Sequence, residues 1–269
     1  MSADFQLLYK EMRTPLRPNF NNAFTRSAIR NYSPLDFGAK LTDLLATLFP
    51  GIDFSGHSKA ELHKMVNAAI CDGYKGEQII KYNLFKQVYR RNLIGAFEMK
   101  VNNSRVDFLT VNGHTTGYEI KSSLDNLDKL GKQSRDYQKV FEFNQIVIDE
   151  SHLKACEDLA PKEFGIITVS GNRKRVKREA RLNPCIDPAA QLTSLTNKER
   201  IIHFNGISSI NECLTVFNAD VINRRYKIAL KQRYEARWKF IVGHAESILP
   251  IDIQFFFNQN IEPLLIYEY

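Results

Sequence analysis

Apolar residues gather in short runs in the middle of the chain, as is typical of β-strands. Residues 106–111 and 118–121 are rich in β-branched and aromatic side chains, and a third apolar run covers residues 96–101. Asn112-Gly113 follows the first of these runs and is a strong hairpin signal. The pattern therefore predicts a β-hairpin.

Apolar residues at helical spacing lie on both sides of this predicted hairpin. Residues 77–88 carry one apolar stripe, Ile80, Leu84 and Val88. A second helix is expected directly after residue 121, with Ser123 or Asp125 as N-cap. Its apolar stripe is Leu127, Leu130, Tyr137 and Phe141. Residues 143–148 are typical of a buried parallel strand reached by a right-handed crossover.

Prolines and changes of pattern divide the chain into three parts. Residues 1–74 are expected to form a mostly helical extension, 75–184 the core, and 185–269 a mainly helical region with an apolar tail. The tail, residues 248–269, indicates a strand or a docked extension. The predicted fold class is α/β, with a mixed central sheet flanked by helices in the order α-β-β-β-α-β and helical N- and C-terminal additions.

Length and composition narrow the class of protein. A chain of 269 residues, 43% of them hydrophobic, can bury a sizeable core. No apolar run approaches a membrane span, and the first residues lack the features of a signal peptide, so we expect a cytoplasmic protein without membrane contact. The four cysteines are scattered singly, which argues against a zinc site or a disulfide framework.

Charged residues on the predicted hairpin indicate a divalent-metal site. Glu119 and Lys121 share one face of their strand because side chains alternate. A register that pairs Asp107 with Glu119 would bring the two acids within about 5 Å at Cβ. Mg²⁺ prefers carboxylate oxygens, so both acids are candidate ligands, and Lys121 is a candidate to assist water attack on a phosphate. An exposed ion pair between Glu119 and Lys121 is the structural alternative.

Glu77 is a further candidate metal ligand. It lies on the apolar stripe of its predicted helix, one turn ahead of Ile80 and its partners. A charge on such a face needs a cation, a metal or water nearby. An acid placed to favour the helix dipole is the alternative.

These residues resemble the PD-(D/E)XK nuclease superfamily, the restriction-endonuclease-like group that includes Mrr-type enzymes and archaeal Holliday-junction resolvases. Val106-Asp107 stands where the superfamily has Pro-Asp, and Glu119-Ile120-Lys121 is the E-x-K half. The stretch from about residue 77 to 184 is also similar to a subgroup of bacterial and phage proteins. The shared residues are Arg105-Val-Asp107, Gly117-Tyr-Glu-Ile-Lys-Ser122, Gln133 with Tyr137, and Val147-Ile-Asp-Glu150.

The resemblance implies an enzyme that cleaves nucleic acid with Mg²⁺ or Mn²⁺, with DNA favoured as substrate. It implies that Glu98 is an extra acid near the metal and that Gln133 contacts the site or the DNA backbone. A strand-surface glutamate and a solvated amide are the respective alternatives. A different class stays open, a nucleic-acid-binding subunit of a defence or repair complex with little cleavage activity of its own. A homodimer or a larger complex is compatible with either class.

Basic residues gather in two segments of this chain, whose formal net charge is +7. One dense cluster follows residues 164–169 and is expected to form a basic turn and edge strand that contacts nucleic acid. Arg105 is a further candidate for phosphate binding. The second group lies on a helix predicted around residues 222–239, where a solvated basic face is the alternative. The members of the dense cluster are Arg173, Lys174, Arg175, Lys177 and Arg178.

Overall fold

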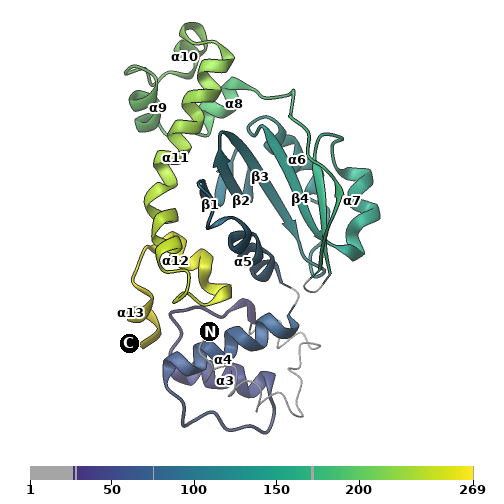
Figure 1. The fold of residues 1–269 in the computed structure, drawn as a ribbon, viewed down its shortest axis with the longest axis vertical. Helices are drawn as coiled ribbons and strands as arrows, with labels where there is room; N and C mark the ends of the chain where they lie inside the picture. Colours follow the sequence, from purple (N-terminus) through teal and green to yellow (C-terminus); the bar gives the residue numbers. More distant parts are fainter. Residues whose placement is uncertain (1–26, 28, 75, 171–172, 269) are drawn as a thin grey trace. The chain divides into compact units, whose positions relative to one another are not determined.

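The computed structural model describes residues 27, 29–74, 76–170 and 173–268 (Figure 1). Contacts group the chain into two compact units. The sheet unit is Asn83–Lys239, and the helical unit combines the residues up to Tyr82 with those from Phe240 onward. The domain boundaries expected from the sequence, after residues 74 and 184, stay a prediction.

The sheet unit contains a six-stranded mixed sheet in which strand order follows chain order. The first three strands are antiparallel neighbours, the third to fifth run parallel, and the sixth returns antiparallel. This confirms the predicted mixed α/β sheet and the hairpin at Asn112-Gly113, where Gly113 has a φ of 73°. The strands are β1 (Ile94–Val101), β2 (Ser104–Asn112), β3 (His114–Lys121), β4 (Phe143–Asp149), β5 (Gly165–Ser170) and β6 (Arg173–Arg178).

Helices cover both faces of this sheet. The boundary between the two units falls inside α5 (Glu77–Val88), which precedes β1, and α6 (Leu130–Gln138) joins β3 to β4. The order α5-β1-β2-β3-α6-β4 is the expected one. The remaining helices of this unit are η1 (Glu150–His152), α7 (Leu153–Leu159), α8 (Pro188–Thr193), α9 (Asn197–His203), α10 (Ile210–Val216) and most of α11 (Ala219–Gly243).

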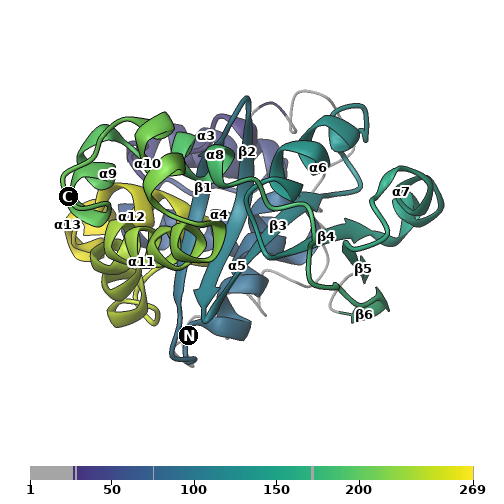
Figure 2. The same cartoon turned by 90° about the horizontal axis from the view of Figure 1, so that it is seen from above.

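The two faces of β3 meet different partners because successive side chains point in opposite directions. On one face, the Phe108 ring is 5.7 Å from Tyr118 and 6.2 Å from Trp238 of α11. On the other face, Phe141, which follows α6, lies directly over Gly117. Figures 1 and 2 accordingly show α6 and α11 on opposite sides of the sheet.

The helix expected directly after β3 begins later than predicted. Helix α6 starts at Leu130, without a side-chain N-cap, and a loop covers the residues from Ser122 onward. Asp125 does not cap a helix, because its Oδ2 accepts hydrogen bonds from the Ser122 backbone N–H (2.7 Å) and hydroxyl (2.6 Å). Such a local bond gives the backbone an alternative to helix, which explains the delayed start.

The basic helix predicted around residues 222–239 is present as α11. Its expected apolar stripe is buried, and its members are Ile222, Tyr226, Leu230, Tyr234 and Trp238. Several basic side chains of α11 are paired rather than solvated. Arg233 forms an ion pair with Glu199 at 2.5 Å, and Lys227 forms one with Glu142 at 2.9 Å.

The helical unit contains α3 (Gly38–Leu48), α4 (Lys59–Gly73), η2 (Pro250–Asp252), α12 (Ile253–Gln259) and α13 (Pro263–Glu268). The tail is therefore helical, and the expectation of a strand is wrong. Ile253, Phe256 and Phe257 are buried, and their spacing of three and four residues suits a helix and not a strand. Within the described residues, none of the helices combines the length and apolarity needed to cross a bilayer.

A polar cluster is buried in the core of the helical unit. Asp252 is 1% exposed, and its Oδ2 accepts hydrogen bonds from the hydroxyls of Tyr267 (2.8 Å) and Tyr32 (3.2 Å) and from Asn67 Nδ2 (3.2 Å). His63 joins the cluster, with Nδ1 3.0 Å from the Tyr32 hydroxyl. Burial raises the pKa of Asp252 to about 7, although the three hydrogen bonds act in the opposite direction.

We expect Gly117→Ala to destabilise the sheet unit by about 1–3 kcal/mol, the usual cost of overpacking a core. An added Cβ would lie 2.6 Å from Phe141 Cδ2, and the Phe141 ring is buried. Urea unfolding followed by circular dichroism measures the effect. Gly131→Ala in α6 is the matched control, because its Cβ would meet nothing closer than 3.7 Å. Equal stabilities of the two variants would contradict the close packing at Gly117.

Candidate active site

Glu98 of β1 and Asp107 of β2 occupy opposite positions in neighbouring antiparallel strands. The ladder pairs that flank this position are Phe97 with Phe108 and Met99 with Val106. Glu98 has a φ of 56°, in the left-handed region that residues other than glycine rarely adopt. Such a backbone costs on the order of 1–3 kcal/mol and clusters at functional sites. The conformation therefore marks this position of β1 as unusual.

The ladder between β2 and β3 ends just before the acids. Its last pair is Phe108 with Tyr118, and one further step in the same register places Glu119 opposite Asp107. Here Asp107 Oδ2 accepts a hydrogen bond from the Ile120 backbone N–H at 2.6 Å. A carboxylate thus takes the place of a backbone partner. Glu98, Asp107 and Glu119 form one row across three strands, which we call the acidic row.

Both carboxylate oxygens of Glu119 are hydrogen-bonded. Glu119 is 2% exposed, and its Oε1 accepts from Lys121 Nζ at 2.6 Å. Its Oε2 lies 2.7 Å from the hydroxyl of Tyr137 on α6, and that hydroxyl is also 2.7 Å from the backbone oxygen of Arg105. Tyr137 therefore joins β2 and β3 where their ladder has ended.

Lys121 carries a positive charge beside the acidic row. Its side chain is 13% exposed. Burial acts to lower its pKa, but the charge and hydrogen bond of Glu119, with smaller effects of Asp107 and Asp125, outweigh burial and raise it. Lys121 is thus an ammonium at neutral pH. The pair that it forms with Glu119 is buried, unlike the exposed ion pair considered from the sequence.

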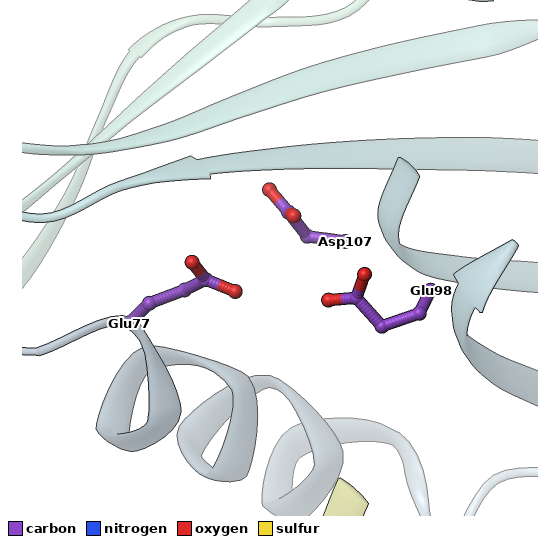
Figure 3. Close-up of side chains that lie close together, drawn as sticks. All are labelled: Glu77, Glu98 and Asp107. Carbon is purple, nitrogen blue, oxygen red and sulfur yellow. The ribbon is translucent and has the colours of Figure 1, made fainter. Parts of the chain in front are cut away.

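Asp107 and Glu98 also approach a third acid, Glu77, on the first turn of α5 (Figure 3). Each of the three offers one carboxylate oxygen, and these oxygens lie within 4.8 Å of one another. Glu77 also forms an ion pair with Lys81 one turn later, so it meets a cation as its place on the apolar stripe required. Within the described part of the chain, Glu77, Glu98 and Asp107 are the three acids that lie close enough together to share a metal ion.

The structure thus separates the predicted ligands into two sets. Asp107 groups with Glu77 and Glu98, whereas Glu119 is held by Lys121 and Tyr137. The assignment of Asp107 and Glu119 as a shared pair of ligands stays a prediction.

Gln133 and Arg105 lie at the borders of the site. Gln133 is one turn before Tyr137 on α6 and hydrogen-bonds its hydroxyl, while Gln133 Oε1 is buried without a partner. The Arg105 side chain is 62% exposed, with Nε 3.9 Å from Glu98 Oε2. The role of Tyr137 was not predicted. The signals in the sequence are the pairing of Tyr137 with Gln133 in the subgroup pattern and its place four residues later, on the same face of a helix.

The predicted basic edge strand is present as β6. Three of its cations have partners. Lys174 Nζ donates to Gln87 Oε1 at 2.6 Å, Lys177 lies 3.6 Å from Glu150, and the Arg178 guanidinium donates to the backbone oxygens of residues 161 and 164. Arg173 and Arg175 are exposed. Because β6 is three strands away from β3, this group is separate from the acidic row.

One known family matches a segment of the chain that contains the whole sheet. The family described as bacteriophage P4 protein cII matches residues 72–256, more than half of the chain. The chain belongs to the bacteriophage P4 protein cII family. The match includes Glu77, Lys121 and every residue of the acidic row.

No curated protein matches this cII-family chain. Among solved structures it is similar to the SPO1766 protein of unknown function from Silicibacter pomeroyi, with 17% sequence identity and a TM-score of 0.34. That alignment covers 44% of this chain and 80% of the other.

Proposed function

We propose that this chain is a metal-dependent nuclease with a restriction-endonuclease-like core, which hydrolyses phosphodiester bonds in DNA. The observation that carries the proposal is the acidic row beside Lys121, at the point where the β2–β3 ladder ends. Asp107 and Glu119 are 9% and 2% exposed. The row thus places three carboxylates beside an ammonium, a combination of side chains that suits a divalent-metal site for phosphate chemistry.

The donor set fits a hard divalent cation. Mg²⁺ and Mn²⁺ prefer oxygen ligands, and Mg²⁺ is usually held by one or two carboxylates together with water and substrate phosphate. Asp107 would hold the ion with Glu98 and Glu77, whose oxygens already lie within 4.8 Å of one another. When bound, the ion would lower the pKa of a coordinated water and offset charge that develops on the phosphate.

The protein side chains around the row have separable tasks. Lys121, as an ammonium, is a hydrogen-bond donor and a positive charge for a phosphate oxygen or an attacking water, and not a proton acceptor. Glu119 fixes the ammonium through the 2.6 Å bond to Oε1. Tyr137 in turn holds Glu119 through the other oxygen. The ammonium is therefore positioned before substrate arrives, which reduces the cost of orienting it during the reaction.

The direct test is incubation of purified protein with supercoiled plasmid, linear duplex, single-stranded DNA and RNA. We expect cleavage of DNA with Mg²⁺ or Mn²⁺ and none with EDTA, because without the ion nothing at the acids activates water or offsets charge on the phosphate. Products on an agarose gel report both activity and preference for ends or closed circles. Binding of nucleic acid without cleavage of any substrate would contradict the proposed nuclease activity. It would favour the nucleic-acid-binding subunit considered from the sequence.

A further inference from the structure

A second cluster of charge lies on the sheet unit, between the end of α5 and the edge strand β6. Arg90 and Arg91 follow Tyr89, which is the first residue after α5. Lys174 of β6 donates a hydrogen bond from Nζ to Oε1 of Gln87, on the last turn of α5, at 2.6 Å. This bond brings two segments together that are far apart in the sequence. Arg90, Arg91 and Lys174 form what we call the basic corner.

The basic corner has no acidic partner in the described part of the chain. None of the ion pairs there includes any of its three members. Burial and the nearby charge of Arg91 lower the pKa of Lys174. The fold thus holds like charges together without internal compensation, an arrangement that a bound anion would relieve.

Arg90 is ordered before any ligand binds. Its Nε donates to the hydroxyl of Tyr89 at 2.8 Å, and its guanidinium lies 5.2 Å from the centre of that ring. Tyr89 in turn stacks on Phe85, with ring centres 5.0 Å apart and planes at 22°. Guanidinium carries five N–H donors in a rigid fork that suits phosphate. An arginine already oriented in this way loses less conformational entropy on binding.

The sheet registers relate the basic corner to the proposed active site. Lys121 of β3, Ile148 of β4, Thr168 of β5 and Arg175 of β6 lie in one row. Lys174 is therefore next to the position on β6 that shares a row with Lys121. Strands are spaced by about 4.8 Å, so three steps separate the backbones of β3 and β6 by roughly 14 Å. Because successive side chains alternate, Lys174 projects from the face opposite to that of Arg175 and Lys121.

We infer that the basic corner binds backbone phosphates of the nucleic-acid substrate beyond the proposed active site. The inference rests on the proposed function for the identity of the substrate, and its test is a binding measurement that does not need cleavage. Phosphate contacts carry no sequence information. The corner is therefore expected to set affinity and position and not base preference.

The test uses the double variant Arg91→Gln with Lys174→Gln in the full-length protein. Fluorescence anisotropy with a labelled DNA duplex, in EDTA to prevent cleavage, gives affinity across a series of salt concentrations. Each phosphate contact contributes about 0.9 to the slope of log affinity against log salt concentration. We expect the slope to fall by about two, with weaker binding to duplexes of unrelated sequence. Thermal melting checks that the variant is folded.

The matched control removes the same charge from exposed helical positions, as Lys198→Gln with Lys231→Gln. An equal loss of affinity and slope in this control would overturn the inference, because net charge alone would then explain the effect. An unchanged slope in the Arg91 and Lys174 variant would overturn it as well. The wild-type protein could also cut no substrate while the Arg91 and Lys174 variant, and not the control, loses binding. That result would support the basic corner and would contradict the nuclease proposal.

Discussion

Asp107→Asn is expected to abolish metal-dependent DNA cleavage, with a loss on the order of 10³-fold, equivalent to about 4 kcal/mol of transition-state stabilisation. Asparagine keeps the size of the side chain, and its carbonyl still accepts the hydrogen bond from the Ile120 N–H. What it removes is the negative charge from the centre of the acidic row. Asp107 faces Glu98 on one side and Glu119 on the other, so its charge bears on both sets of ligands.

Two measurements separate loss of the site from loss of the fold. Initial rates of plasmid nicking report catalysis. The melting temperature with and without Mg²⁺ reports metal binding, because an ion at ten times its Kd stabilises the folded state by about 1.4 kcal/mol. We expect wild-type protein to show both effects and Asp107→Asn neither.

Glu235→Gln is the matched control for this variant. Glu235 is an exposed acid on α11 that pairs with Lys239 at 2.6 Å, so its removal also takes away one negative charge. This variant should cleave at the wild-type rate. An Asp107→Asn protein that keeps its Mg²⁺-dependent rate within about tenfold of wild type would rule out Asp107 as an essential ligand.

The second large effect concerns stability and Asp252. The pKa of this carboxyl is about 7 in the folded state and near its ordinary 3.8 in the unfolded chain. The folded state therefore holds the proton more tightly. The stability that this proton contributes is complete below pH 3.8 and is lost as pH rises through about 7. Between pH 5 and pH 8 the loss amounts to about 2–3 kcal/mol.

Asp252→Asn tests this effect, because asparagine has no proton to lose. We expect the free energy of unfolding of the variant, minus that of wild type, to rise by about 2–3 kcal/mol between pH 5 and pH 8. Urea unfolding at several pH values measures it. His63, whose pKa burial lowers to about 4, produces the opposite slope in both proteins and cancels in the difference. Asp43→Asn, at an exposed position of α3, is the matched control, because it also replaces one carboxylate by an amide.

The sheet was largely predictable because its signals are local. Runs of β-branched and aromatic residues predicted the strands, and Asn112-Gly113 predicted the hairpin. The start of α6 was missed because Asp125 bonds to Ser122 instead of capping a helix. The helical tail was missed because a short run of aromatic residues suits either structure, and only packing decides between them.

The residues of the candidate site were likewise predictable only in part. Asp107, Glu119 and Lys121 follow from strand alternation within one hairpin. Glu98 was expected near the metal from the resemblance alone, because its approach depends on a left-handed backbone that a glutamate rarely adopts. The hydroxyl of Tyr137 reaches Glu119 from a helix that begins only after a loop, so its contact depends on tertiary packing.

The charge on β6 has a consequence for self-association. β6 is an outer strand of the sheet, and the backbone groups on the open side of such a strand are a template for pairing with a strand of another molecule. Five of its six residues are lysine or arginine, so a second copy brought alongside would meet a row of like charges. The residues that favour binding of an anionic polymer therefore also prevent β6 from pairing with β6 of a second copy. Replacing all five together would remove that protection and expose the sheet to aggregation.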